Sequence, residues 1–391
     1  MSPARRLPVR TCAALAAFAL AACSGGGRHT TSAAPTTSAG PSVDIAFIGP
    51  LTGTGSQSGQ AIGNGVRLAV DRHNARAGVH VKLITYDTGG DPVQAARLAR
   101  AAAADHVAGV VGPTGLQDSM AADPVFEQAA VVNITPSATT PSLADNGWHY
   151  WHRVVGTDAD QGPAVARYLV KKLNARKVAV VDEDTEYGKG IADIVRSDLR
   201  AGSVTVDPSR SIDLGQDDSA VAAAISAGRV DAVFYGGTDT GAGRLLKRLR
   251  RDGVRAAFVS DDLARDDLFI ATAGATAAEG ALLTCPCGDV SASPGGAAFI
   301  SAYRAAFGTG PGPYSAQAYD AANLIMSAVD AGRRSAADVN TFISTTTYHG
   351  ITNDISFDGK GQLTGGGIYL YRVRGGGIAV VGLVTRLLGN P

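Results

Sequence analysis

The stretch Asn133-Ile134-Thr135-Pro136-Ser137-Ala138-Thr139-Thr140-Pro141 joins a short apolar run to a loop of hydroxyl-bearing and small residues. The run, residues 129–134, predicts a buried parallel strand because it is short, β-branched and followed by turn residues. In open α/β sheets ligands bind beyond the carboxyl ends of the strands, where this loop lies. Its hydroxyls and N–H groups suit a carboxylate. For this segment alone, an ordinary strand-to-helix turn with an N-cap is the alternative.

The bulk composition limits the possible functions. The chain has 391 residues, which allows one large or two medium domains. Its formal net charge is zero and only 18% of residues are charged, which argues against a nucleic-acid partner. The sequence contains no nucleophile elbow, phosphate loop, dinucleotide fingerprint or zinc-peptidase motif. We therefore expect a protein that is not an enzyme and needs neither a cofactor nor a metal.

The N-terminus has the pattern of a targeting segment. Positively charged residues precede an apolar run, residues 12–22, that is too short to span a bilayer. The run ends in Leu20-Ala21-Ala22-Cys23, which resembles the lipobox of bacterial lipoproteins. That resemblance implies a signal peptide over residues 1–22 and lipidation of Cys23 on the extracytoplasmic face of the cell membrane. Residues 23–42 then form a flexible tether. A plain secretory signal is the alternative.

Two cysteines remain in the folded part of the chain, in Cys285-Pro286-Cys287. An oxidising compartment favours a local structural disulfide between Cys285 and Cys287. A loop this small would constrain the unfolded chain very little. Free thiols are the alternative, because a metal site would need further ligands that no nearby segment supplies.

Strands and helices alternate through two successive stretches of the sequence. The first starts with an apolar strand at residues 44–50 and a helix at 61–75, and the second ends with a strand at 257–260. Such alternation predicts parallel sheets with helices on both faces. The remaining chain becomes helical and ends in two strand-like runs joined by three glycines, typical of a hairpin. We expect this last part to return to the first unit and then cross again.

A series of short motifs runs in order along nearly the whole mature chain. Among them are Ile48-Gly49-Pro50-Leu51-Thr52-Gly53, Asp91-Pro92-Val93-Gln94-Ala95, Val110-Val111-Gly112-Pro113, Pro136-Ser137-Ala138-Thr139, Asp158-Ala159-Asp160-Gln161-Gly162-Pro163, Glu186-Tyr187-Gly188-Lys189-Gly190 and Gly312-Pro313-Tyr314. Together they resemble the type I periplasmic-binding-protein superfamily, and within it the leucine/isoleucine/valine-binding proteins of ABC transporters.

The resemblance implies an α/β fold of two Rossmann-like, doubly wound lobes joined by a hinge of three crossover segments. Lobe I would comprise residues 43–156 and 285–365, and lobe II residues 157–284 and 366–391. The implied function is an extracytoplasmic solute-binding protein of an ABC importer, which captures a branched-chain or another neutral amino acid by hinge closure. Its partners would be the permease and the ATPase subunits, and we expect a monomer. A sensor of the same fold for an amino acid or amide, acting on a signalling receptor, is the alternative.

The resemblance also assigns roles in ligand binding. A backbone carbonyl at Ser137 would accept from the ligand ammonium, Thr139 would donate to its carboxylate, Tyr187 would cap the cleft, and Asp262 would pair with the ammonium. The complete set of expected ligand-binding residues is Gln117, Ser137, Ala138, Thr139, Tyr187, Asp262 and Tyr314.

Several positions depart from the family pattern. The family usually has Glu where this chain has Asp262, and Asp261 is adjacent, so either carboxylate could face the cleft. A hydroxyl residue expected after the third strand is replaced by Leu116, which leaves Gln117, Asp118 or Ser119 for its role.

Other departures concern the width of the pocket and the family disulfide. Ser58 and Thr238 stand where aromatic residues are expected, which predicts a wider or more polar pocket. The positions of the family disulfide carry Gly90 and Gly115, so Cys285 and Cys287 form a local feature of this chain.

Overall fold

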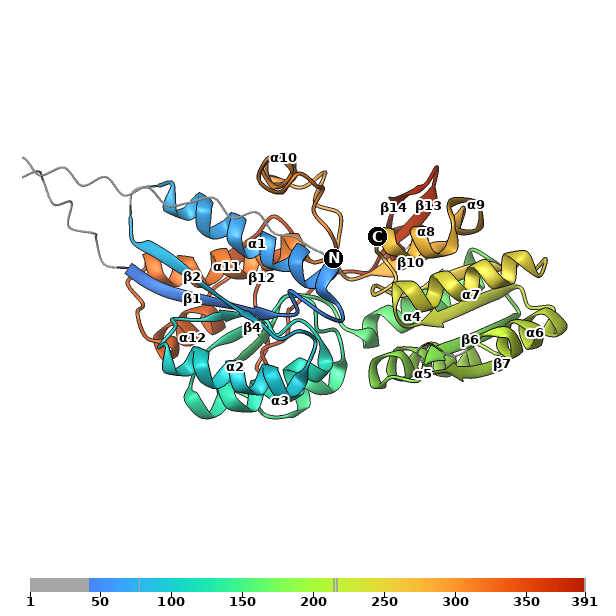
Figure 1. The fold of residues 1–391 in the computed structure, drawn as a ribbon, viewed down its shortest axis with the longest axis horizontal. Coiled ribbons are helices and arrows are strands. Elements are labelled where there is room, and N and C mark those ends of the chain that lie inside the picture. The colour runs from blue at the N-terminus through green and yellow to red at the C-terminus, as the bar shows by residue number, and fades with distance from the viewer. Residues whose placement is uncertain (1–41, 77, 214, 216, 390–391) are drawn as a thin grey trace, which may run out of the picture. The chain divides into compact units, whose positions relative to one another are not determined.

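The structure is a computed structural model that describes residues 42–76, 78–213, 215 and 217–389. The predicted signal peptide, Cys23 and the tether lie outside the described residues. A five-stranded and a seven-stranded sheet organise the described chain, and helices cover both faces of each (Figure 1). We name the elements around the five-stranded sheet lobe I and those around the seven-stranded sheet lobe II.

The sheet of lobe I is parallel, with the strand order β2-β1-β3-β4-β5. Its strands are β1 (Ser42–Gly49), β2 (His80–Asp87), β3 (Val110–Val111), β4 (Asn133–Thr135) and β5 (Trp151–Arg153). Successive side chains of a strand point to opposite faces. Accordingly, Ile45 and Phe47 pack in one hydrophobic cluster and Ala46 and Ile48 in another. Burial on both faces explains why residues 45–48 of β1 are all apolar.

Helices from two distant parts of the chain cover this sheet. They are α1 (Ser56–Asn74), α2 (Pro92–Ala104), α3 (Leu116–Ala129), α10 (Gly296–Phe307), α11 (Ser315–Asp330) and α12 (Ala336–Thr345), with a 3-10 helix at Pro141–Asp145 and a small ladder of β11 (Tyr348–His349) and β12 (Asp354–Ile355). Helices α1 and α11 lie together on one side of β1 and β2, and α2 and α3 lie on the other (Figure 1). The chain therefore returns to lobe I after building most of lobe II.

The sheet of lobe II has the order β14-β13-β10-β9-β8-β6-β7. Its parallel strands are β6 (Lys177–Glu183), β7 (Thr205–Ile212), β8 (Ala232–Gly236), β9 (Ala257–Ser260) and β10 (Leu282–Cys285), followed by the antiparallel hairpin β13 (Tyr369–Arg374) and β14 (Gly377–Leu383). Its helices are α4 (Asp158–Lys171), α5 (Glu186–Ala201), α6 (Ser219–Gly228), α7 (Asp239–Arg251), α8 (Asp267–Ala273), α9 (Ala275–Ala278) and α13 (Val384–Leu387). Val178 and Val180 pack in one cluster and Ala179 and Val181 in another, so β6 is also buried on both faces.

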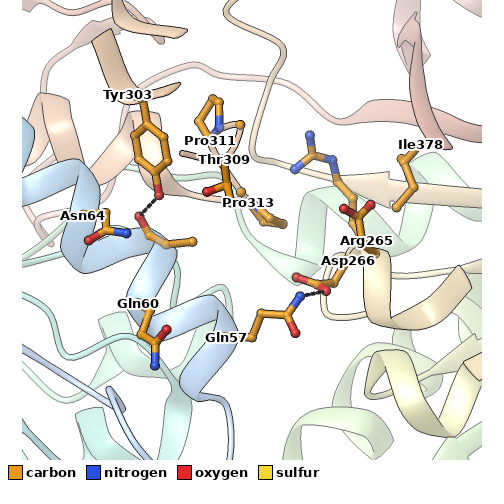
Figure 2. A pocket seen from close by; sticks show the side chains of 14 residues that line it. Gln57, Gln60, Asn64, Arg265, Asp266, Tyr303, Thr309, Pro311, Pro313 and Ile378 are labelled. Carbon is orange, nitrogen blue, oxygen red and sulfur yellow. Dashed lines mark hydrogen bonds between the residues drawn. The ribbon is translucent and has the colours of Figure 1, made fainter. Parts of the chain in front are cut away.

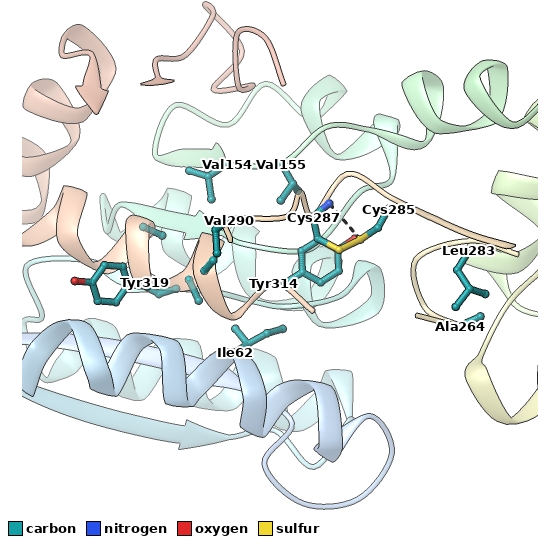
Figure 3. Packing of buried hydrophobic residues seen from close by; sticks show 14 of the residues in the cluster. Ile62, Val154, Val155, Ala264, Leu283, Cys285, Cys287, Val290, Tyr314 and Tyr319 are labelled. Carbon is teal, nitrogen blue, oxygen red and sulfur yellow. Dashed lines mark hydrogen bonds between the residues drawn. A yellow bond between two sulfur atoms is a disulfide. The ribbon is translucent and has the colours of Figure 1, made fainter. Parts of the chain in front are cut away.

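The chain passes between the two sheets three times: from β5 to α4, from β10 to α10, and in the segment that precedes β13. Apolar residues of the first two connections share one hydrophobic cluster. Val154 and Val155 belong to the first, and Cys285, Cys287 and Val290 belong to the second (Figure 3). The connections are thus part of the packed core.

Some predicted elements differ from the structure in extent. The strand predicted at residues 129–134 is limited to Asn133–Thr135, because α3 continues to Ala129 and Ala130 then adopts a left-handed conformation with φ 53°. The apolar pattern could not separate the last helical residue from the approach to the strand. Helices α8 and α9 were not predicted, since each is short and neither shows a long apolar period. Among the described residues, no helix combines the length and apolarity needed to cross a bilayer.

Candidate ligand-binding site

A cavity of about 480 Å³ lies where loops from the carboxyl ends of strands in both lobes meet. Lobe I contributes the loops after β1, β2, β3 and β4, and lobe II contributes those after β6 and β9. Of the residues predicted to bind a ligand, those that line the cavity are Gln117, Ser137, Ala138, Thr139, Tyr187 and Asp262. Tyr314 does not line it, although its hydroxyl donates to Asp262 over 2.6 Å.

The loop after β4 is held by its own side chains and by a buried arginine. The Ser137 hydroxyl donates to the Thr114 carbonyl over 2.7 Å, and the Ala138 N–H donates to the Thr135 hydroxyl over 3.1 Å. Arg153 in β5 is fully buried, and its Nη1 donates to the carbonyls of Ala138 and Thr140 over 3.1 and 2.8 Å. These contacts fix the loop before any ligand binds, which lowers the entropy lost on binding.

Arg153 also connects this loop to the third passage between the lobes. Its Nη2 donates to the side-chain oxygen of Gln362, and its backbone N–H donates to the Gly361 carbonyl over 2.9 Å. Its guanidinium lies over the Trp151 ring at 5.1 Å. Sequence reasoning missed this residue, because a lone arginine at the end of a strand carries no motif of its own.

Asp262 is the carboxylate that faces the cavity. Its two oxygens accept from the hydroxyls of Tyr187 (2.9 Å) and Tyr314 (2.6 Å). Burial raises the pKa of Asp262 above its usual range, although these two hydrogen bonds oppose the rise. Tyr187 and Tyr314 therefore both donate to the Asp262 carboxylate, and of the two only Tyr187 lines the cavity.

The neighbouring Asp261 has a different environment. Its Oδ2 accepts from the Gly237 N–H over 2.8 Å, and its Oδ1 accepts from the Leu263 N–H over 3.1 Å. It is fully buried and does not line the cavity. Of the two carboxylates that the sequence left open, Asp261 binds the backbone of its own loop and of the loop after β8, and Asp262 faces the cavity.

A third buried carboxylate, Asp158, lies close enough to interact with both. Burial and the charge of Asp262 raise the pKa of Asp158 to about 7, while hydrogen bonds from the side chains of Thr139 and Thr140 oppose the rise. Its Oδ1 has no hydrogen-bond partner among the described residues. Asp262 at the cavity wall thus has two buried carboxylates near it that do not line the cavity themselves, and no Lys, Arg or His of the described chain lines it. The Asp158 motif was noted in the sequence, but its approach to Asp262 depends on the tertiary fold.

The residues proposed to replace the missing hydroxyl after β3 have separate partners. Gln117 donates from Nε2 to Glu186 over 2.6 Å, which links the start of α3 in lobe I to the start of α5 in lobe II. Asp118 lines the cavity and accepts from the Thr88 hydroxyl over 2.7 Å. Ser119 is fully buried and does not line the cavity.

Only some of the positions that depart from the family pattern line the cavity. Leu116, Gly90 and Gly115 line the cavity, whereas Ser58 and Thr238 do not. Thr238 instead caps α7, where its hydroxyl accepts from the Gly241 N–H. Ser58 and Thr238 thus contribute no side chain to the wall of this cavity, and a wider or more polar pocket at these positions stays a prediction.

The sulfur atoms of Cys285 and Cys287 are joined as a disulfide. Cys285 is the last residue of β10, and Cys287 lies in the connection that leads to α10. Both are buried, and Tyr314 and Val155 lie next to them (Figure 3). Within the described residues, no group of three or more His, Cys, Asp or Glu side chains is arranged to hold a metal ion.

The chain is similar to proteins of one family along most of its length. Residues 42–377 match the family model described as periplasmic binding protein. The chain is 28% identical over 328 residues to the leucine-specific-binding protein of Salmonella typhimurium, covering 83% of this chain and 88% of that protein. It is also 28% identical over 330 residues to the leucine-, isoleucine-, valine-, threonine-, and alanine-binding protein of Pseudomonas aeruginosa, with the same two coverages of 83% and 88%.

A solved structure has a similar fold. The branched-chain amino acid transporter substrate binding protein LivJ from Streptococcus pneumoniae, in complex with isoleucine, superposes with a TM-score of 0.81. The two sequences are 25% identical, and the match covers 87% of this chain and 99% of the other.

Proposed function

Since the chain belongs to the periplasmic binding protein family, we propose that it captures a free amino acid outside the cytoplasm and delivers it to the permease of an ABC importer. The observation that carries the proposal is the meeting of the Ser137–Thr140 loop and Asp262 in one cavity of about 480 Å³. A zwitterion needs hydrogen-bond donors at one end and an anionic group at the other. This cavity offers both.

The ammonium end of the ligand would lie against Asp262. Burial raises the pKa values of all three carboxylates, Asp158, Asp261 and Asp262, and the charge of Asp262 raises those of Asp158 and Asp261 further, so negative charges at these positions repel one another in a buried region. A bound ammonium would offset this repulsion directly. The hydroxyls of Tyr187 and Tyr314 keep Asp262 oriented for that contact.

The carboxylate end would lie against the loop after β4. Thr139 is buried at the cavity wall, and its backbone N–H is the donor that we assign to the ligand carboxylate. Its hydroxyl, which is hydrogen-bonded to Asp158 in this structure, would have to turn toward the ligand to add a second donor. Because Arg153 already holds the adjacent carbonyls, the loop has little freedom left to lose.

The ligand that we favour is a branched-chain or another neutral amino acid. The names of the relatives from Salmonella and Pseudomonas support this class, as does the isoleucine bound to the related structure from Streptococcus. Leu116, Leu263 and Pro50 supply apolar walls for such a side chain. Hinge closure would bring Gln117 and Tyr187 around the ligand. Lipidation of Cys23 would keep the protein near the permease and the ATPase subunits.

A thermal-shift screen of residues 24–391 against all amino acids, short amides, urea and polyamines tests the proposal. A ligand that binds only the native state raises the melting temperature according to its saturation. We expect a shift with leucine, isoleucine or valine. A response only to amides or polyamines would contradict binding of a zwitterion, because those compounds lack the carboxylate that Thr139 is assigned to bind.

A further inference from the structure

A second cavity, of about 500 Å³, shares no lining residue with the amino-acid site (Figure 2). One wall is a polar face of α1, where Gln57, Gln60 and Asn64 follow the spacing of one helical face. The opposite wall contains Arg265 and Asp266 at the start of α8. Elements of both lobes therefore bound this cavity.

Arg265 is held in place but lacks an anionic partner. Its guanidinium lies over the Tyr371 ring at 4.0 Å, and its Nη1 donates only to the weak acceptor Sγ of Cys287, over 3.4 Å. Its Nε is buried without a hydrogen-bond partner among the described residues. No carboxylate of the described chain lies within ion-pair distance of it, although its charge opposes the rise that burial causes in the pKa of Asp266. A guanidinium presents several donors in a fixed fork that matches a carboxylate. Figure 2 shows Arg265 across the cavity from Asn64 and Gln60.

The same cavity also contains two acidic residues, Asp266 and Asp267, which favour a ligand that donates hydrogen bonds. Asp266 accepts from the Leu268 N–H over 2.9 Å as the N-cap of α8, and also from the Gln57 side chain. Asp267 lines the cavity beside it. Arg265 and Asp266 thus influence each other's charge without forming an ion pair. The side-chain amides of Gln60 and Asn64 line the same cavity, and Gln60 Nε2 donates to the Leu51 carbonyl over 2.8 Å, which leaves its amide oxygen for a ligand. This arrangement suits a molecule that has one carboxylate and several hydroxyl groups.

We propose that this cavity is a second binding site for a small polyhydroxylated carboxylate. Its carboxylate binds the fork of Arg265, and its hydroxyls bind Asp266 and the amides of Gln60 and Asn64. A dianion is disfavoured by Asp266 and Asp267, and a simple cation is disfavoured by Arg265. The proposal goes beyond the amino-acid site and does not depend on it, because no residue is shared.

The test is a calorimetric titration of residues 24–391 with sodium D-gluconate, and with D-sorbitol as the compound that lacks only the carboxylate. We expect saturable binding of gluconate and at least tenfold weaker binding of sorbitol. Arg265→Gln should weaken gluconate binding at least tenfold, because a charge-assisted bidentate contact is lost. The gluconate affinity of Arg265→Lys should lie between those of the wild type and Arg265→Gln, because lysine keeps the positive charge and loses the planar fork of donors.

Two further variants test whether the loss of gluconate binding is specific to this cavity. Asn64→Leu changes the opposite wall without touching the contact of Arg265 with Tyr371, and it should also weaken gluconate binding. Arg251→Gln is the matched control, because Arg251 is an exposed arginine of α7 that pairs with Asp252 and lies outside the cavity. It should bind gluconate like the wild type.

Three results would overturn the second site: no saturable gluconate binding by the folded wild type, equal affinities for gluconate and sorbitol, or unchanged gluconate affinity in Arg265→Gln. Arg265→Gln should retain amino-acid binding. A wild type that binds gluconate but no amino acid would overturn the proposed function and leave the second site standing.

Discussion

Two adjacent aspartates, Asp261 and Asp262, differ in what their oxygens contact. We predict that Asp262→Asn weakens amino-acid binding by about 1.5–3 kcal/mol, because the ligand ammonium loses its ionised partner. Asp261→Asn should instead lower the melting temperature with little effect on affinity, since one acceptor for the Gly237 or Leu263 N–H is lost. Calorimetry and thermal unfolding of both variants measure the two effects. If Asp261→Asn weakened binding and Asp262→Asn lowered only the melting temperature, Asp261 would be the ligand partner.

The buried carboxylate of Asp158 makes binding depend on pH. Its pKa of about 7 in the folded protein lies above the roughly 3.9 of an unfolded chain. Between these values the native state holds the extra proton, so this group's contribution to the free energy of unfolding decreases as pH rises. A bound ammonium favours the ionised form. We therefore predict proton release on binding near pH 6, and an affinity that rises with pH up to about 7.

Titrations at pH 6 in buffers with different ionisation enthalpies measure this proton release. Asp158→Asn removes the titrating group, so its binding enthalpy should depend less on the buffer than that of the wild type. Proton uptake by the wild type would contradict the assignment of an ammonium to this end of the cavity.

At the scale of elements, the hydrogen bond from Gln117 to Glu186 links the first turns of α3 and α5 across the cavity. A contact made between lobes stabilises the closed form without steering the first encounter with the ligand. We predict that Gln117→Ala speeds ligand dissociation about three- to tenfold and leaves the association rate nearly unchanged. Stopped-flow kinetics measures both rates.

Gln94→Ala is the matched control, because Gln94 is a half-buried glutamine of α2 that lies outside the cavity and accepts a hydrogen bond from Arg97 of its own helix. It should leave both rates unchanged. If Gln117→Ala slowed association instead, Gln117 would contact the ligand during encounter, as the family resemblance first suggested.

The order of elements could be predicted because strands such as β1 and β6 contain an uninterrupted apolar run, residues 45–48 and 178–181, that is buried on both faces. The exact ends of the strands could not be predicted, because β4 starts at Asn133 although the apolar run begins earlier. The same limit applies to the site. The loop at Ser137–Thr140 is visible as a motif, but the approach of Asp158 to Asp262 and the contact of Arg153 with the loop depend on three-dimensional packing.

At the scale of the whole molecule, lobe I supplies the donors and lobe II the anionic group, so a ligand with both ends should engage both lobes. The most direct measurement is a calorimetric comparison of leucine with 4-methylpentanoate, which lacks the ammonium, and 3-methylbutylamine, which lacks the carboxylate. We predict that leucine binds saturably and that each analogue binds at least about tenfold more weakly, because each leaves one set of buried groups without its partner. Equal binding of leucine and either analogue would contradict recognition of a zwitterion by this cavity.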